Sequence, residues 1–140
     1  MELILNKIGK IREYIKLINS IKEDCMVRFA SDPLYRGSLL HYLYLLSDSC
    51  IALAEMVIKY KKLRFPQTYY EAFDILGENK ILDPEFAFSF AKIASFRNFL
   101  AHDYEKIDKS AICKDALSKI NEVEEFLRQI ESSLEINKDM

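Results

Sequence analysis

The stretch that decides the fold is DPLYRGSLLHYLYLLSDSCIALAEMVIKYKK, residues 32–62. It begins with Asp32 and Pro33, an N-cap residue followed by the proline that suits the first position of a helix. The apolar residues that follow cover more than one stripe of a helix, so this helix must pack on several sides. We predict a long helix that either lies at the centre of a helical bundle or has one face against another subunit.

Helix signals also flank this segment. Isoleucines from Ile4 to Ile18 recur at spacings of three or four and predict a first helix over residues 3–24 with one apolar seam. After the long helix, Thr68-x-x-Glu71 has the pattern of a capping box. It predicts a short third helix that ends at Gly77, where a left-handed conformation is easily tolerated.

Two more helices complete the predicted fold. Asp83-Pro84 repeats the start signal of the long helix and predicts a phenylalanine-rich helix to about His102, whose phenylalanines we assign to core packing. Asp108 caps a fifth helix with a heptad-like apolar seam. With only 3 Gly, 3 Pro and no hairpin signal, the sequence argues against a sheet. We therefore predict an all-α fold, in which residues 1–140 form a single-domain antiparallel helical bundle of about five helices.

The composition excludes several classes of protein. Half of the 140 residues are hydrophobic, 30% are charged and the net charge is -2, so no bulk positive field exists to hold long duplex nucleic acid. Any contact with nucleic acid must be local. The 3 cysteines are far apart and form no C-x-x-C pair, which argues against a disulfide framework and a zinc knuckle. Without a long apolar run or a secretory signal, we expect no membrane span and a reducing, cytoplasmic environment.

The segment RNFLAHDY, residues 97–104, places an Arg, an Asn, a His and a Tyr at the end of an otherwise apolar helix. At about 100° per residue, Asn98 and His102 lie on nearly the same side of the helix. Arg97 and His102 flank a gap above Ala101, which lies between them around the helix. Arginine binds phosphate oxygens through its planar fork, and imidazole exchanges a proton near neutral pH. The segment is therefore the candidate site of the chain.

This set of residues suits metal-free cleavage of RNA. Its surroundings have no carboxylate pair at metal spacing, no second histidine, no glycine-rich phosphate loop and no Cys or Ser beside a His. RNA carries its own nucleophile, the 2'-hydroxyl, so a protein needs only a group that accepts or donates a proton and a cation that stabilises the phosphorane. We predict these roles for His102 and Arg97, with Asn98 in support, no metal and no cofactor, and products that end in a 2',3'-cyclic phosphate.

A structural interpretation of the same residues remains open. In it, His102 caps the helix carbonyls and Asn98 is incidental. Arg97 then pairs with an acidic residue such as Glu105 or Asp108. Spacing alone does not decide between this interpretation and a catalytic site.

Two other features are candidates for binding or packing. The basic cluster at the end of the long helix consists of Lys59, Lys61, Lys62 and Arg64. It is a candidate for RNA contact, and the alternative is a solvated helix end whose cations complement the helix dipole. His41 lies among apolar residues with no acidic or cysteine neighbour at ligand spacing, so we expect it in the core or at an interface.

The candidate site resembles a known family. The pattern R-N-x-x-x-H, here Arg97 to His102, resembles the signature of the HEPN superfamily of small helical RNases. The longer motif through Tyr104 is similar to that of the HepT toxins, which pair with MNT-type (MntA-type) nucleotidyltransferase antitoxins. Further segments resemble the family in the same order over nearly the whole chain: D-P-L at 32–34, P-Q-T-Y at 66–69, A-F-D-I-L at 72–76 and I-D at 107–108.

The resemblance implies the function in more detail. It implies an endoribonuclease toxin of a toxin–antitoxin pair, in which Arg97 and His102 are catalytic and Asn98 has a supporting role. It also implies that the partner nucleotidyltransferase silences the toxin by adding AMP to Tyr104. The family is homodimeric, with the motifs of two subunits facing each other across the two-fold axis. Such pairing agrees with the residues, because one Arg and one His make a sparse site and two copies supply both an acid and a base.

A second class of function remains open. In it, the chain is a non-catalytic helical binding module that partners a nucleotidyltransferase or binds a nucleotide. The intact set of Arg97, Asn98 and His102 favours the enzyme, because a scaffold has no physical need to keep these three residues together.

Overall fold

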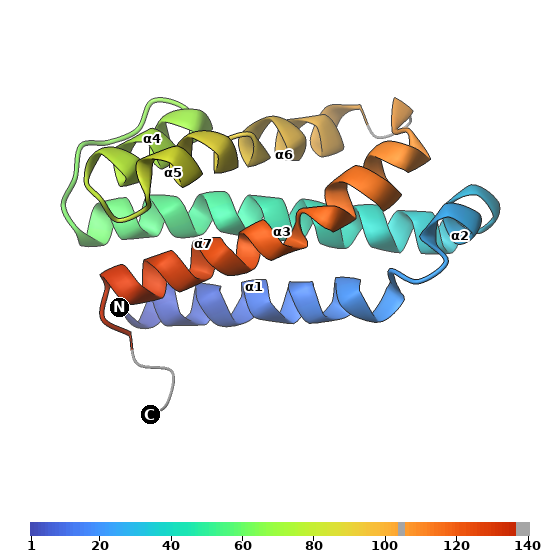
Figure 1. Cartoon of the computed structure of the whole chain (residues 1–140), viewed down its shortest axis with the longest axis horizontal. Helices are drawn as coiled ribbons and strands as arrows, with labels where there is room; N and C mark the ends of the chain where they lie inside the picture. The colour runs from blue at the N-terminus through green and yellow to red at the C-terminus, as the bar shows by residue number, and fades with distance from the viewer. Residues whose placement is uncertain (104–105, 137–140) are drawn as a thin grey trace.

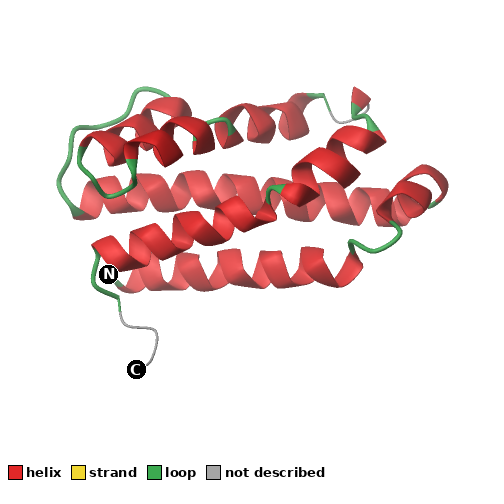
Figure 2. Ribbon diagram, viewed as in Figure 1, coloured by secondary structure: helices red, strands yellow, loops and turns green. Residues whose placement is uncertain are grey.

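The computed structural model describes residues 1–103 and 106–136. Within these ranges the chain forms helices joined by loops, so the predicted all-α fold is confirmed (Figure 2). In chain order the elements are α1 (Glu2–Ile21), α2 (Cys25–Ser31), α3 (Pro33–Tyr60), α4 (Tyr69–Glu78), α5 (Pro84–Phe90), α6 (Ile93–His102), the π-helical segment η2 (Ala111–Ala116) and α7 (Ile120–Ser133).

The long helix α3 lies at the centre of the bundle (Figure 1). Along one side of it lies α1, and along the other side α4, α5 and α6 follow one another, while α7 crosses obliquely in front. Direct contacts of α3 with α1, α4 and α6 agree with this arrangement. The predicted central position of the helix in residues 32–62 is therefore confirmed.

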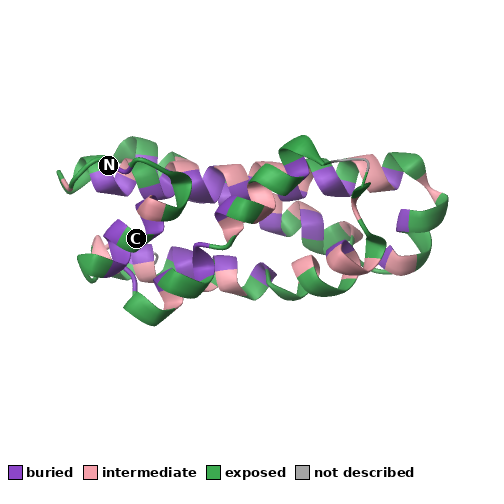
Figure 3. Cartoon of the chain, turned by 90° about the horizontal axis from the view of Figure 1, so that it is seen from above, coloured by how far each residue is buried: buried purple, intermediate pink, exposed green. Residues whose placement is uncertain are grey.

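The packing of α1 and α3 follows from their sequences. The five isoleucines of the predicted seam on α1 are all buried, and Figure 3 shows buried and exposed residues recurring along the helices. The carboxylate of Asp32 accepts hydrogen bonds from the backbone N–H groups of Leu34 and Tyr35, which confirms the N-cap of α3. By length and composition α3 could cross a membrane, but 56% of its most apolar window is buried inside the bundle.

Gly77 does not end α4 in a left-handed conformation, so that prediction is wrong. It is buried inside α4, which continues to Glu78. A Cβ atom at Gly77 would lie 2.9 Å from the Cβ of Ala87, so the missing side chain allows α5 to approach α4 closely. The left-handed residue is Lys80 instead, with a φ of 61°.

The predicted phenylalanine-rich helix is broken into α5 and α6 at residues 91–92. Its start is confirmed, because the carboxylate of Asp83 accepts a hydrogen bond from the backbone N–H three residues later. Phe90 is buried and stacks on Phe126 of α7, with 4.8 Å between the ring centroids. Phe88 is 77% exposed, because it lies about 200° around the helix from Phe90. The assignment of the whole phenylalanine run to the core is therefore wrong at Phe88 and at Phe99, which is also exposed.

The predicted fifth helix forms two elements, η2 and α7. Its cap is confirmed, because the carboxylate of Asp108 accepts a hydrogen bond from the backbone N–H of Ala111. The apolar seam of α7 is buried as predicted. At the far end of α7, the guanidinium of Arg12 from α1 donates hydrogen bonds to the buried carboxylate of Glu131, which joins the first helix to the last.

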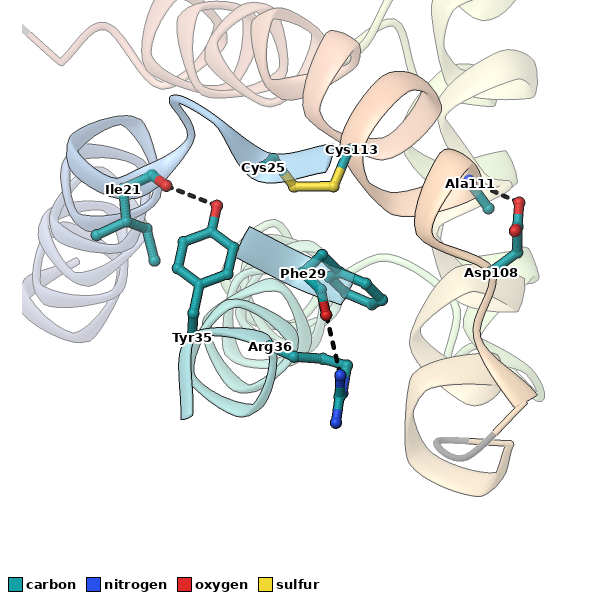
Figure 4. Close-up of a disulfide and its surroundings, with 8 residues drawn as sticks. All are labelled: Ile21, Cys25, Phe29, Tyr35, Arg36, Asp108, Ala111 and Cys113. Atoms are coloured by element: carbon teal, nitrogen blue, oxygen red, sulfur yellow. Dashed lines mark hydrogen bonds between the residues drawn. A yellow bond between two sulfur atoms is a disulfide. The ribbon is translucent and has the colours of Figure 1, made fainter. Parts of the chain in front are cut away.

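A disulfide between Cys25 and Cys113 joins α2 to η2, which corrects the expectation from cysteine spacing (Figure 4). Asp24, with a φ of 58°, turns the chain between α1 and α2 just before Cys25. The Cα atoms of the two cysteines are 5.6 Å apart, a separation that a disulfide spans. The sequence did not indicate this pair, because the residues are 88 positions apart and only the fold brings them together. Cys50 remains a free, buried thiol.

Candidate active site

Arg97 of α6 extends its side chain onto the central helix α3. Its Nε donates a hydrogen bond to Oδ1 of Asp48 at 3.0 Å, and its Nη2 donates to the hydroxyl of Tyr44 at 3.0 Å. Its Nη1 donates to Oδ1 of the neighbouring Asn98 at 3.2 Å. Tyr44 and Asp48 lie one turn apart on α3, so both reach the same guanidinium. Only 19% of the Arg97 side chain is exposed.

These contacts do not use all the donors of the guanidinium. A guanidinium has five N–H donors, and Asp48, Tyr44 and Asn98 each accept from a different one of its three nitrogens. One N–H therefore remains on Nη1 and one on Nη2 after the contacts with described residues are counted. Two such donors suit two oxygens of one phosphate group.

Two aromatic rings flank the same guanidinium. The Cζ atom of Arg97 lies 5.2 Å from the ring centroid of Tyr44 and 5.4 Å from that of Tyr69, the first residue of α4. Partial burial alone would lower the pKa of Arg97, but the hydrogen bond to Asp48 and the charges of Tyr44, Asp48 and Tyr69 raise it above its ordinary value. Arg97 therefore keeps its positive charge.

His102 lies apart from Arg97. It is the last residue of α6, where the helix dipole favours a cation, and its side chain is exposed. Five residues of helical rise separate the two by about 7.5 Å along the axis. Among the described residues, no hydrogen bond or ion pair joins His102 to Arg97. Asn98 is also exposed, and of Arg97 and His102 it contacts only Arg97. Within one chain, direct contacts among the described residues therefore do not bring Arg97 and His102 together.

The structural interpretation expected Arg97 to pair with an acidic residue such as Glu105 or Asp108, and Arg97 does pair with an acidic residue, but not with Asp108. The carboxylate of Asp108 caps the following helical segment, and the carboxylate that pairs with Arg97 is that of Asp48. Sequence reasoning missed Tyr44, Asp48 and Tyr69. The available signal was the spacing of four between two polar residues on a mostly apolar helix, which places Tyr44 and Asp48 on one face.

The basic cluster does not join this site. Lys59, at the end of α3, is eleven residues beyond Asp48, which corresponds to about 16 Å along the helix. The guanidinium of Arg64 is already paired with Glu71 at 3.1 Å and with Glu78 at 2.9 Å. The three lysines of the cluster are exposed. They remain candidates for contact with a long ligand, whereas Arg64 has acidic partners of its own.

The remaining predictions for individual residues have different outcomes. His41 is exposed, so the expectation of a core position is wrong, and an interface position stays a prediction. Tyr104 and Glu105 lie outside the described residues. Among residues 1–103 and 106–136, no group of three or more His, Cys, Asp or Glu side chains is arranged to hold a metal ion.

An apolar cavity lies close to the motif but does not include its polar residues. This cavity of about 320 Å³ lies between α3, α6, η2 and α7. Its lining includes Phe96 and Phe99, which flank the motif in sequence, but not Arg97, Asn98 or His102. The polar residues of the motif therefore lie outside this cavity.

The chain is similar to known proteins over nearly its whole length. The chain is 24% identical to the mRNA nuclease HepT of Shewanella oneidensis over 131 residues, covering 94% of this chain and 98% of the relative. It is 28% identical to the tRNA nuclease HepT of Aphanizomenon flos-aquae over 134 residues, covering 96% and 89%. The fold matches the tri-AMPylated HEPN toxin of Shewanella oneidensis, solved in complex with an MNT antitoxin, at a TM-score of 0.84 and 23% identity, covering 94% and 98%. Residues 11–130 match the family described as ribonuclease HepT-like, and the chain belongs to that family.

Proposed function

We propose that this protein is a metal-independent endoribonuclease toxin of a toxin–antitoxin pair. The observation that carries the proposal is the guanidinium of Arg97, which α3 holds in place with two N–H donors left over, on the same helix as the exposed His102. Membership of the ribonuclease HepT-like family and the nuclease names of two relatives support RNA as the substrate. The residues proposed as catalytic are Arg97 and His102, with Asn98 in support.

The proposed reaction is an internal transfer within RNA. The oxygen of the 2'-hydroxyl forms a bond with the adjacent phosphorus, and its proton passes to a neutral imidazole nitrogen. The N–H donors of Arg97 stabilise the charge on the phosphorane oxygens. The bond from phosphorus to the 5'-oxygen then breaks, and that oxygen takes a proton from an imidazolium. The products are a 2',3'-cyclic phosphate and a 5'-hydroxyl.

A homodimer would complete this site. Within one chain His102 and Arg97 are separated along the helix, and Arg97 turns toward α3 and away from the helix end. If two motifs face each other across a two-fold axis, the histidine of one subunit can approach the arginine of the other, and two histidines supply the base and the acid. Light scattering at micromolar concentration tests the dimer, and a monomer would contradict the composite site.

The partner is proposed to be an MNT-type nucleotidyltransferase that adds AMP to Tyr104. The name of the matched HEPN toxin, which is tri-AMPylated and bound to an MNT antitoxin, supports this assignment. An added AMP would place a phosphate and an adenosine beside the motif, where they would compete with RNA for the charge of Arg97. We also propose a cytoplasmic location, for which the disulfide between Cys25 and Cys113 removes the argument from cysteine spacing. The exposed Lys59, Lys61 and Lys62 are proposed as contacts for the RNA backbone.

The test compares purified variants on labelled RNA. Arg97→Ala and His102→Ala should each abolish cleavage, while circular dichroism and light scattering show unchanged helices and assembly. Arg128→Ala is the matched control, because Arg128 is an exposed arginine of α7 that pairs only with Glu125 in the same helix among the described residues. Cleavage that survives both changes at the motif would move the active site elsewhere and favour a non-catalytic binding module.

A further inference from the structure

We propose that Asp48 is a positioning residue for Arg97: it fixes the orientation of the guanidinium toward the phosphate, although its own charge opposes RNA binding. This inference rests on the proposed ribonuclease function. It assigns a role to a residue of α3, far from the motif in sequence.

The contacts of α3 restrain the guanidinium in its plane. Asp48 accepts from Nε and Tyr44 accepts from Nη2, and both distances are 3.0 Å. These two nitrogens lie along one edge of the group, so the pair of acceptors sets the direction of the opposite donors. An unrestrained arginine side chain has many rotamers, and ordering it during the reaction would cost conformational entropy. Asp48 and Tyr44 supply that order beforehand.

Stability does not explain the presence of Asp48. Its side chain is 45% exposed, and an ion pair with so much solvent contact contributes little to folding. A carboxylate beside a phosphate-binding arginine also repels the phosphate and weakens the field that attracts RNA. The remaining effect of Asp48 is the hydrogen bond that it accepts from Nε of Arg97, which orients the guanidinium for catalysis.

Glu55 provides a matched control on the same helix. It lies seven residues after Asp48, which places it on the same face of α3 about 10 Å along the axis. Burial and the charge of Asp48 raise the pKa of Glu55, so the two carboxylates sense each other. Within the part of the chain that the structure describes, no hydrogen bond or ion pair joins Glu55 to Arg97. A change at Glu55 therefore removes a similar charge without removing the restraint on Arg97.

The first measurement separates kcat from KM for RNA cleavage. Asp48→Ala removes the acceptor, and kcat should fall about 100-fold, the loss expected from a misplaced catalytic group. Asp48→Asn keeps an oxygen that can accept from Nε, so kcat should stay within about threefold of wild type, while KM falls because the repelling charge is gone. Glu55→Gln should lower KM slightly and leave kcat unchanged. Equal kcat values for Asp48→Ala and Asp48→Asn, whether low or normal, would overturn the proposal.

The second measurement reads the orientation of Arg97 without RNA. In a ¹H–¹⁵N spectrum, the Nε–H signal of Arg97, assigned by its loss in Arg97→Lys, should be protected from exchange in wild type, Asp48→Asn and Glu55→Gln. It should lose that protection in Asp48→Ala. If the wild-type protein cleaves no RNA, the proposed function fails, and this spectrum decides alone whether Asp48 positions Arg97. An unchanged signal in Asp48→Ala would refute the positioning role.

Discussion

Breaking the disulfide between Cys25 and Cys113 should lower the stability of the bundle substantially. The bond ties α2, a helix of 7 residues, to η2 (Figure 4). The best single change is Cys113→Ser, because Cys113 is half-buried whereas Cys25 is only 5% exposed. A hydroxyl at position 113 is therefore less costly to accommodate than one at position 25.

The size of the effect follows from the length of chain that the bond closes. A cross-link between residues 88 positions apart removes unfolded-state entropy worth about 4.6 kcal/mol at 25 °C in the loop-closure treatment. Native disulfides typically contribute about 2–4 kcal/mol. For a chain of 140 residues, the entropy of unfolding converts this range into a fall in Tm of about 7–14 °C.

The assay is thermal and urea unfolding of the oxidised wild type, the reduced wild type and Cys113→Ser. Thiol titration under denaturing conditions should count one thiol, that of Cys50, in the oxidised protein, and all 3 cysteines after reduction. The control is Cys113→Ser with and without reductant, whose Tm should not respond. A wild-type Tm that is the same with and without reductant, despite the expected thiol counts, would refute the entropic reasoning.

Three further predictions concern other parts of the chain. In urea unfolding, Gly77→Ala should destabilise the protein by about 1–3 kcal/mol, because its Cβ would meet the Cβ of Ala87 in α5 at 2.9 Å. Gly9→Ala is the control and should be neutral or stabilising, because a Cβ there would have nothing within 4 Å. The Glu125 carboxylate should titrate with a pKa of about 2 in NMR, because hydrogen bonds from Arg128 and Gln129 lower its pKa. Its contribution to stability should be complete above its unfolded pKa and be lost as the pH falls through about 2. Arg128→Ala should return the pKa of Glu125 toward its ordinary value. Tyr104→Phe should escape inactivation by a partner nucleotidyltransferase with ATP and Mg²⁺, and mass spectrometry that places the AMP on another residue of wild type would contradict this assignment.

Much of the fold was predictable because the signals for helices, apolar spacing and end caps, are local in the sequence. The isoleucine spacing of α1 and the caps at Asp32, Thr68, Asp83 and Asp108 depend only on residues within a turn or two. The failures occurred where another helix decides the outcome. Gly77 is a site of close approach between α4 and α5, and this approach is invisible in the sequence around the glycine.

The candidate site was predictable in part for the same reason. Arg97, Asn98 and His102 stand out because polar residues end an apolar helix, and this signal is local. The partners of Arg97 come from α3, about fifty positions earlier in the chain, so spacing within the motif could not indicate Asp48. Likewise, the contact between Cys25 and Cys113 depends on how α2 and η2 pack, which no spacing rule provides.

The most direct test of the proposed chemistry compares two substrates of the same sequence in EDTA. One is an RNA oligonucleotide that the protein cleaves, and the other carries a single 2'-deoxynucleotide at the cleaved position. We predict cleavage of the first without added metal, a product that ends in a 2',3'-cyclic phosphate by mass spectrometry, and no cleavage of the second at that position, because the nucleophile is the missing 2'-hydroxyl. Cleavage of the deoxy-substituted strand at that position, or strict dependence on added Mg²⁺, would contradict the assignment of Arg97 and His102 to metal-free transfer.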